Sequence, residues 1–335
     1  MTSPQLTDQA GPASARPPAR ILRSLDGLEP ALKGAVVALG NFDGVHKGHQ
    51  AVIAAARTQA DALGVPLGVL SFEPHPRAYF NPTLPEFRLT PLAAKARALG
   101  RVGADFIAAL PFDAAMAGMQ AESFVTDILM GALGIAHVVI GFDFCFGQGR
   151  AGNGQLLARM GKAEGFGLTI VEAVSHDGEV YSSTLIRSLL VEGKPRQAAR
   201  LMGHWWHIEG PVLPGDQRGR TIGFPTANIA LEGYLHPALG VYAVRVELDG
   251  VIHGGVANFG KRPTFDKKDA LLEVHLFDFA GDLYGRVPVV TFVEFLRAER
   301  KFNGLEELKA QIAADSARAR EILADPAFAL ADPAT

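Results

Sequence analysis

From residue 35 onward, short apolar runs alternate with helical patterns. Five apolar runs have the length and composition of buried strands: 36–40, 65–72, 104–112, 136–144 and 168–174. Apolar residues at helical spacing occupy 48–63, 121–134 and 153–165. A further helix is predicted to begin at Thr90-Pro91, with Thr90 as its N-cap. Strands that alternate with helices predict an α/β domain whose parallel sheet is covered on both faces.

The pattern changes after about residue 187. A short helical segment over 182–192 leads through Gly193-Lys194-Pro195 into apolar runs rich in Val, Phe and Tyr. These runs are 205–213, 240–248, 251–258, 271–278 and 288–296. Short strands separated by turn residues predict an antiparallel β-barrel or sandwich. Apolar residues at helical spacing between Leu305 and Leu323 predict a terminal helix.

These patterns divide the chain into two domains, at 21–187 and 204–325, with a junction helix at 188–203. Flanking tails are predicted at 1–20 and 326–335. The first twenty residues are rich in Pro, Ala and Arg, a composition that also occurs in targeting peptides. Asp8 and the prolines argue against an amphipathic helix there, so we expect a disordered tail.

Composition narrows the functional classes. The 335 residues are 48% hydrophobic with a formal net charge of −3, and neither half is basic, which argues against a nucleic-acid partner. No stretch approaches the roughly 18 apolar residues that a membrane span needs. The single cysteine, Cys145, excludes an intramolecular disulfide and fits a cytoplasmic protein.

The sequence GNFDGVHKGH at 40–49 directly follows the first predicted strand. Its glycines allow close backbone approach, and the following helix offers unpaired N–H groups to a phosphate. His46 and His49 lie three residues apart at the helix start, where both can face a nucleotide α-phosphate and stabilise developing charge. The alternatives are a two-histidine metal site, for which this loop supplies few further ligands, and a helix cap with surface histidines.

Two further segments lie at the ends of predicted strands. Ser182 to Arg187 opens a helix, and its hydroxyls with Arg187 can hold β- and γ-phosphates, although capping alone also explains Ser182 or Ser183. Phe72 to Pro76 (FEPHP) follows the second strand and is either part of a site or a turn with a surface histidine.

Two glycine motifs are not interpreted as the nucleotide-binding motifs that they resemble. Residues 147–152 (GQGRAG) fit a dinucleotide fingerprint with Glu172 twenty residues beyond, but in the fourth strand unit rather than the first. We interpret them as a flexible loop able to touch a ligand, with a nicotinamide site as the alternative. Residues 255–261 resemble a P-loop, which Arg262 and Pro263 spoil, so that reading is rejected.

The second half carries two groups of candidate residues. A loop from Gly219 ends in Thr226 and Asn228, whose oxygens suit Mg²⁺, although an ordinary polar loop has the same composition. Glu273 lies in an apolar strand and is either a paired structural charge or a general base. His204 and His207 suggest a metal, but strand alternation would point them to opposite faces, which favours packing.

Together these motifs resemble those of the prokaryotic bifunctional riboflavin kinase/FMN adenylyltransferases, also called FAD synthetases. GNFDGVHKGH, FEPHP, GFDFCFG and SSTLIR resemble the adenylyltransferase half, an HxGH nucleotidyltransferase. GRTIGFPTANI, GVYAV and LLEVHLFDF followed by DLYG resemble the kinase half. The resemblance covers about residues 21–325 and implies two reactions that use ATP and Mg²⁺: riboflavin to FMN, and FMN to FAD with release of pyrophosphate.

The resemblance also implies residue roles. His46, His49 and Glu273 would be catalytic, Thr226 and Asn228 would bind Mg²⁺, and flavin would contact Pro74, His75 and Asp143. ATP would contact Gly40, Phe42, Asp43, Gly48, Ser183, Thr184, Arg187, Gly219, Thr221 and Gly223. The lead-in His204-Trp205-Trp206 departs from the commoner Gly-Arg-Pro followed by an aromatic residue.

Two other functions remain as alternatives: a flavin-binding carrier or sensor with a degenerate nucleotide domain, and a nicotinamide-dependent dehydrogenase built on residues 147–152. The expected partners are riboflavin, FMN, FAD and ATP, without nucleic acid or membrane.

Overall fold

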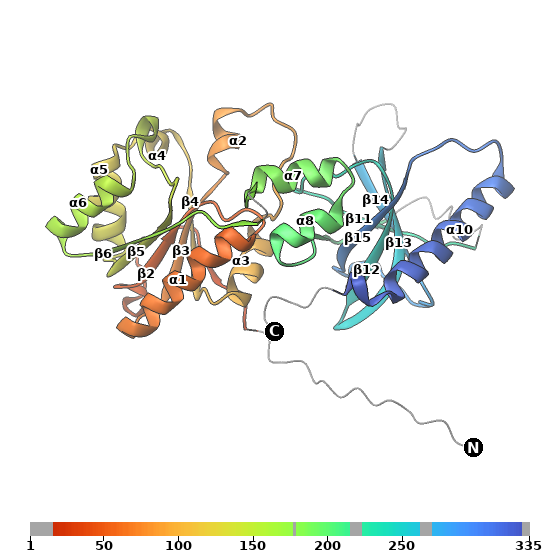
Figure 1. The fold of residues 1–335 in the computed structure, drawn as a ribbon, viewed down its shortest axis with the longest axis horizontal. Helices are drawn as coiled ribbons and strands as arrows, with labels where there is room; N and C mark the ends of the chain where they lie inside the picture. Colours follow the sequence, from red (N-terminus) through yellow and green to blue (C-terminus); the bar gives the residue numbers. More distant parts are fainter. Residues whose placement is uncertain (1–15, 177–178, 215–222, 262–269, 330–335) are drawn as a thin grey trace, which may run out of the picture.

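A computed structural model describes residues 16–176, 179–214, 223–261 and 270–329. The first half contains a six-stranded parallel sheet in the order β1-β4-β3-β2-β5-β6 (Figure 1). Its strands are β1 (Arg20–Leu22), β2 (Val36–Leu39), β3 (Leu67–Glu73), β4 (Phe106–Pro111), β5 (His137–Gly141) and β6 (Gly167–Val171). The five predicted strands are all present, and β1 adds a strand at the edge beside β4.

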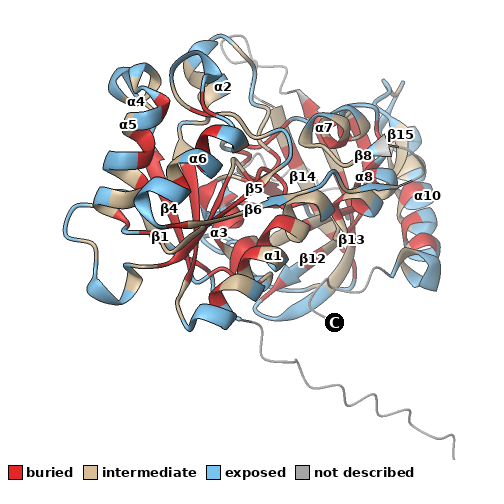
Figure 2. Ribbon diagram, turned by 60° about the vertical axis from the view of Figure 1, so that its left-hand side comes forward, coloured by how far each residue is buried: buried red, intermediate tan, exposed pale blue. Residues whose placement is uncertain are grey.

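Helices cover both faces of this sheet, as predicted. They are α1 (Lys47–Leu63), α2 (Pro76–Phe80), α3 (Leu92–Arg101), α4 (Ala114–Gly118), α5 (Ala121–Ser123), the π-helical segment η2 (Phe124–Ala132) and α6 (Gly154–Glu164). Alternate residues of β2 pack on opposite sides: Val36 joins the core under α1, whereas Val37 joins the core under η2 and α6. Buried side chains therefore lie on both faces of the sheet, and its strands are largely buried along their length (Figure 2).

The prediction that Thr90 caps α3 is wrong. Helix α3 begins after Pro91 without a side-chain cap. The Thr90 hydroxyl instead accepts a hydrogen bond from the Gly44 amide at 2.9 Å and lies 3.3 Å from the Asp43 carboxylate. Tertiary contacts with the loop after β2 thus replace the local cap.

The second half forms a curled seven-stranded antiparallel sheet in the order β10-β11-β14-β13-β12-β15-β9. Its strands are β9 (His207–Glu209), β10 (Val212–Leu213), β11 (Ala227–Ile229), β12 (Gly240–Leu248), β13 (Val251–Lys261), β14 (Ala270–Leu276) and β15 (Val289–Ala298). The two edge strands, β9 and β10, are separated in the chain by Gly210-Pro211 alone, which brings the sheet round on itself. Helix α10 (Leu305–Ala324) packs Ala319 and Ile322 against its outer face.

Two helices connect the halves: α7 (Ser183–Val191) and α8 (Pro195–Met202) (Figure 1). Ile186 of α7 and Met202 of α8 lie in one apolar core with residues of the curled sheet, and that core also includes Leu89 of the first half. The Trp206 indole donates a hydrogen bond to the Leu89 carbonyl at 2.9 Å. The halves therefore share packed side chains and backbone contacts.

Candidate functional site

The strand order places a crevice beside β2. After β2 the chain moves to β3 on one side and later returns to β5 on the other, so the order reverses between β2 and β5. In such sheets ligands bind at this reversal, beyond the carboxyl ends of the strands. The loops that begin at Gly40 and at Phe142 both leave the sheet there, and these loops carry two of the motifs identified from sequence.

A cavity of about 500 Å³ lies at this edge of the sheet. Aromatic rings form much of its wall, and two arginines also line it. Its lining includes Phe72, Phe80, Phe112, Phe124, Phe144, Phe146, Arg77 and Arg150. Rings of this kind suit a planar aromatic ligand, and guanidinium groups suit its phosphate.

Two of the three predicted flavin-binding residues line this cavity. His75 and Asp143 line it, and so does Gly40, whereas Pro74 is not among its lining residues. Sequence reasoning did not single out Arg77, Phe80 or Phe112, because each lies in a segment without a motif of its own. The interpretation of residues 147–152 as a ligand-touching loop gave the only signal for Arg150.

The two histidines at the start of α1 are stacked, with ring centroids 3.6 Å apart. His46 is the N-cap, and its Nδ1 accepts a hydrogen bond from the His49 amide. Burial lowers the pKa of His46 to about 4 and that of His49 well below its ordinary value. Both rings are therefore neutral near pH 7, and they can stabilise a phosphate by donating hydrogen bonds rather than as cations.

Two details show how this pair is held. With Nδ1 as acceptor, the neutral His46 ring carries its proton on Nε2, which is then a donor. A side chain at Gly48 would meet the His46 ring at 3.2 Å, so glycine leaves room for it. The Nδ1 atom of His49 is buried without a hydrogen-bond partner in the protein, so it is available to a ligand or a water molecule.

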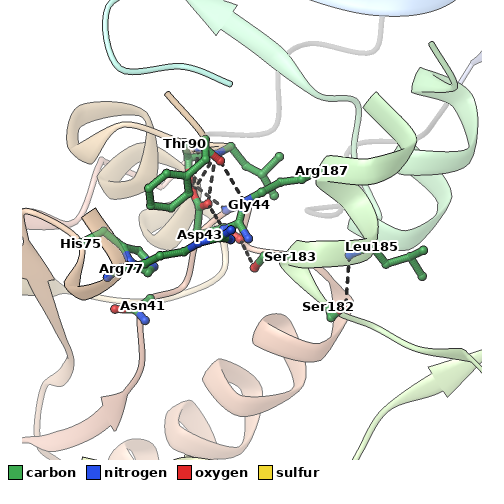
Figure 3. A network of polar contacts seen from close by, with 12 residues as sticks. Asn41, Asp43, Gly44, His75, Arg77, Thr90, Ser182, Ser183, Leu185 and Arg187 are labelled. Atoms are coloured by element: carbon green, nitrogen blue, oxygen red, sulfur yellow. Dashed lines mark hydrogen bonds and ion pairs between the residues drawn. The ribbon is translucent and has the colours of Figure 1, made fainter. Parts of the chain in front are cut away.

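Asp43 is the centre of a buried network beside this loop (Figure 3). Its carboxylate is 2% exposed, accepts hydrogen bonds from the amides of Leu89 and Thr90, and lies 2.6 Å from Arg187 Nη2. Burial alone would raise the pKa of this carboxyl, but the charges of Lys95 and Arg187 hold it below its ordinary value. Asp43 and Arg187 thus satisfy each other within the protein.

The start of α7 lies against the same loop. Ser182 caps the helix by accepting from the Leu185 amide, which confirms the capping interpretation for that residue. The Ser183 hydroxyl donates to the Asp43 carbonyl at 2.9 Å, and Thr184 is exposed. Arg187 also donates from Nε to the Phe87 carbonyl. Ser183 and Arg187 therefore tie α7 to the loop that presents the histidines.

A second candidate site lies on the curled sheet. Asn228 of β11 pairs directly with Glu273 of β14. Leu272 and Val274, on either side of Glu273, belong to the core, so Glu273 faces outward on the same side as His275. Glu273 is half-buried rather than fully buried, because this face is covered only in part.

The oxygens around Glu273 fit a hard cation. Asn228 is 7% exposed, and its Oδ1 is buried without a hydrogen-bond partner. Thr226, two residues earlier, is exposed beside it, and Gly223 lies in a turn with φ +88°. Gly219 and Thr221 lie outside the described residues. A buried amide oxygen that lacks a donor is suited to a magnesium ion that also binds nucleotide phosphates.

Two further predictions concern residues 255–261 and the histidines His204 and His207. Residues 255–261 lie within β13, so the rejection of a P-loop there is confirmed. The prediction that His204 and His207 point to opposite faces is wrong: β9 begins only at His207, and the two ring centroids are 6.4 Å apart.

Among the described residues, no group of three or more His, Cys, Asp or Glu side chains could hold a metal ion. No helix in the described ranges is long and apolar enough to cross a membrane.

Comparisons with known proteins agree with this division into two sites. A family model described as FAD synthetase matches residues 28–185, and one described as riboflavin kinase matches residues 202–323. The chain is 44% identical over 310 residues to the bifunctional riboflavin kinase/FMN adenylyltransferase of Pseudomonas fluorescens, covering 92% of this chain and 99% of that protein. It is 40% identical to the Escherichia coli K12 protein of the same name, covering 94% and 100%.

A solved structure from Streptococcus pneumoniae, titled as a macrolide-efflux protein, is similar over 90% of this chain and 98% of its own. Its TM-score is 0.81 at 32% identity, so the two chains share their fold over the matched 90% of this chain. The order of the two family models, the near-complete coverage of the relatives and the fold lead to one conclusion: this chain belongs to the bifunctional riboflavin kinase/FMN adenylyltransferase family.

Proposed function

We propose that this enzyme converts riboflavin and ATP to FMN on the curled sheet, and FMN and a second ATP to FAD at the edge of the parallel sheet. The observation that carries the proposal is that both family models match, in order, the two halves that hold the two candidate sites. The corresponding domains are 21–187 and 204–325, joined by 188–203, and the single cysteine fits the cytoplasm as their compartment.

In adenylyl transfer, an FMN phosphate oxygen attacks the α-phosphorus of ATP, and the bond to the β-phosphate oxygen breaks to release pyrophosphate. Neutral His46 and His49 donate hydrogen bonds to the α-phosphate oxygens as charge builds on them. The flavin ring occupies the aromatic cavity with His75 and Asp143. Pro74 does not line the cavity, so its contact with flavin remains a prediction.

Fewer residues are assigned to the ATP phosphates than the sequence predicted. Gly40, Gly48 and exposed Thr184 remain available to ATP, as does Gly223 in the kinase half. Phe42 is 1% exposed and packs its ring against His49, with centroids 5.2 Å apart. Phe42, Asp43, Ser183 and Arg187 are therefore assigned to positioning the loop, in place of the predicted phosphate contacts.

In the kinase reaction, the ribityl hydroxyl attacks the γ-phosphorus of ATP and the bond to the β-phosphate oxygen breaks. Glu273 accepts the hydroxyl proton. Asn228 Oδ1 and the Thr226 hydroxyl would hold Mg²⁺, which neutralises phosphate charge when bound. The direct pairing of Asn228 with Glu273 supports this assignment, since it brings the base next to the phosphate end of the nucleotide.

Incubation of the purified protein with riboflavin, ATP and Mg²⁺, followed by chromatography of the flavins, tests the function. We expect FMN to appear first and FAD to follow. Riboflavin that is bound but unchanged would indicate a carrier or sensor instead. Absence of turnover and of flavin binding, together with nicotinamide-dependent activity, would indicate a dehydrogenase.

A further inference from the structure

The loop between β2 and α1 has an unusual backbone. Phe42, Gly44 and Val45 have φ values of +48°, +84° and +40°. The left-handed region is unfavourable for residues other than glycine, and most of all for a β-branched one such as Val45. Such conformations persist only where surrounding contacts hold them. The loop needs this support because it presents His46 and His49.

Contacts from the same half hold one side of the loop. The Gly44 amide donates to the Thr90 hydroxyl at 2.9 Å, as Figure 3 shows. The Asp43 carbonyl accepts from Ser183 at 2.9 Å. These contacts leave the carbonyls of Gly44 and Val45 to be bound by other groups.

A side chain of the second half binds the first of these carbonyls, and Gln50 of the first half binds the other. His204 Nε2 lies 3.1 Å from the Gly44 carbonyl, which can only accept, so Nε2 donates. Gln50 of α1 donates from Nε2 to the Val45 carbonyl and to the Met202 carbonyl, both at 2.8 Å. Gly203, in the left-handed conformation at the end of α8, carries the chain from Met202 to His204 close against Gln50.

His204 is also close enough to the catalytic pair to affect it. Burial is the main cause of the low pKa of His46, and a charge on His204 contributes in the same direction. The second ring nitrogen of His204, Nδ1, also lies 3.1 Å from a carbonyl, that of Trp205. Both contacts are hydrogen bonds when the ring is protonated, because a neutral imidazole donates from one nitrogen alone. One edge of the ring thus contacts the backbone of its own segment, and the other edge contacts the loop between β2 and α1.

We infer that His204, from the kinase half, is a positioning residue for adenylyl transfer: its Nε2–H holds the Gly44 carbonyl and so keeps the turn in the form that presents His46 and His49. The inference rests on the proposed function of the first half. It means that the adenylyltransferase site is completed by a side chain beyond residue 187. His204 acts through the loop and does not itself touch the reacting atoms.

The test uses the full-length chain with two substitutions at one position. His204→Phe keeps a flat ring but removes the donor, and His204→Gln returns an N–H donor near the place of Nε2. Because a displacement of about 1 Å in catalytic groups can cost on the order of 10²-fold, we expect His204→Phe to lower kcat for FAD formation roughly 10–100-fold, with a smaller change in KM. His204→Gln should recover most of that loss.

Two controls separate positioning from general damage. FMN formation from riboflavin, measured in the same samples, should be unchanged in both variants. Arg97→Gln removes a different contact between the halves, the ion pair with Glu209, and should leave FAD formation close to that of the parent. The control shows whether any loosening of the interface has the same effect.

The inference would be overturned by FAD formation in His204→Phe within about threefold of the parent, a change much smaller than a displaced catalytic group produces. Equal loss in His204→Gln, joint loss of FMN formation, or the same loss in Arg97→Gln would also overturn it. A parent chain that makes FMN but no FAD, or a His49→Ala variant with full FAD formation, would instead refute the proposed function on which the inference rests.

Discussion

The imidazole of His46 stacks on that of His49 with centroids 3.6 Å apart, and burial keeps both rings neutral. A pair of neutral rings acts through directed N–H donors, and its effect depends on their positions. This explains why the loop before α1 receives so many contacts, from Thr90, Ser183, Gln50 and His204.

We expect His49→Ala to reduce FAD formation by about 10²–10³-fold, the usual cost of losing one preorganised donor. FMN formation should be nearly unchanged, since Asn228 and Glu273 lie on the other sheet. His253→Ala, a histidine of β13 outside both sites, is the matched control. Equal loss of both reactions in His49→Ala would show that the two sites are not separate.

The buried histidines predict how stability depends on pH. The pKa values of His46 and His75 are lowered to about 4 and that of His207 to about 3, in each case mainly by burial, from an ordinary value of 6.5. Between these limits the unfolded chain binds more protons than the folded chain, so the free energy of unfolding falls as pH is lowered from 6.5 towards 4. Each ring contributes a slope of at most about 1.4 kcal/mol per pH unit.

Urea unfolding at pH 7.0, 6.0 and 5.0 measures this slope. We expect little change above pH 7 and a progressive loss below pH 6.5, steeper than a single histidine explains. A free energy of unfolding that stays constant down to pH 5 would mean that these rings titrate in the folded chain with the same pKa as in the unfolded chain.

Asp43→Asn tests the positioning role of the Asp43–Arg187 pair. Removing the carboxylate charge leaves the Arg187 guanidinium without its partner at 2.6 Å. Breaking a buried pair in this way typically costs about 3–5 kcal/mol of stability. Glu29→Gln breaks the exposed pair with Arg20 and should have little effect on unfolding. Similar small changes in both variants would contradict a central structural role for Asp43.

Asn228→Leu distinguishes a metal ligand from a structural residue. Leucine has a similar size and removes a buried oxygen that has no hydrogen-bond partner, so thermal stability should be unchanged or improved. FMN formation should fall sharply, whereas FAD formation from supplied FMN should continue. A fall in Tm with FMN formation retained would mean that Asn228 is a packing residue and not a ligand of Mg²⁺.

Much of the fold follows from sequence pattern. Five of the six strands of the parallel sheet, β2 to β6, are continuous apolar runs, which periodicity identifies well, and the glycines of residues 40–49 mark the turn after β2. The short strand β11 was missed, because three residues, Ala227 to Ile229, are too few to show alternation. β1 was missed for the same reason.

The site was harder to predict where it depends on contacts distant in sequence. No local signal shows that Thr90 binds the Gly44 amide rather than capping α3, or that His204 contacts the carbonyl of the same residue from 160 residues away. Likewise, an arginine at the start of a helix has the same sequence signature whether it binds phosphate or, like Arg187, a buried carboxylate. Charge type was therefore predictable, but the partner was not.

We propose that one chain carries two separate sites linked by FMN. Glu273→Gln should block FMN formation, since a lost general base costs about 10²–10⁴-fold, and His49→Ala should block FAD formation. Mixing these two full-length variants with riboflavin, ATP and Mg²⁺ tests the claim most directly. We predict that neither variant alone makes FAD from riboflavin and that the mixture does, because FMN made by His49→Ala is adenylylated by Glu273→Gln. FAD formation by either variant alone at the parent rate, or none in the mixture, would contradict the claim.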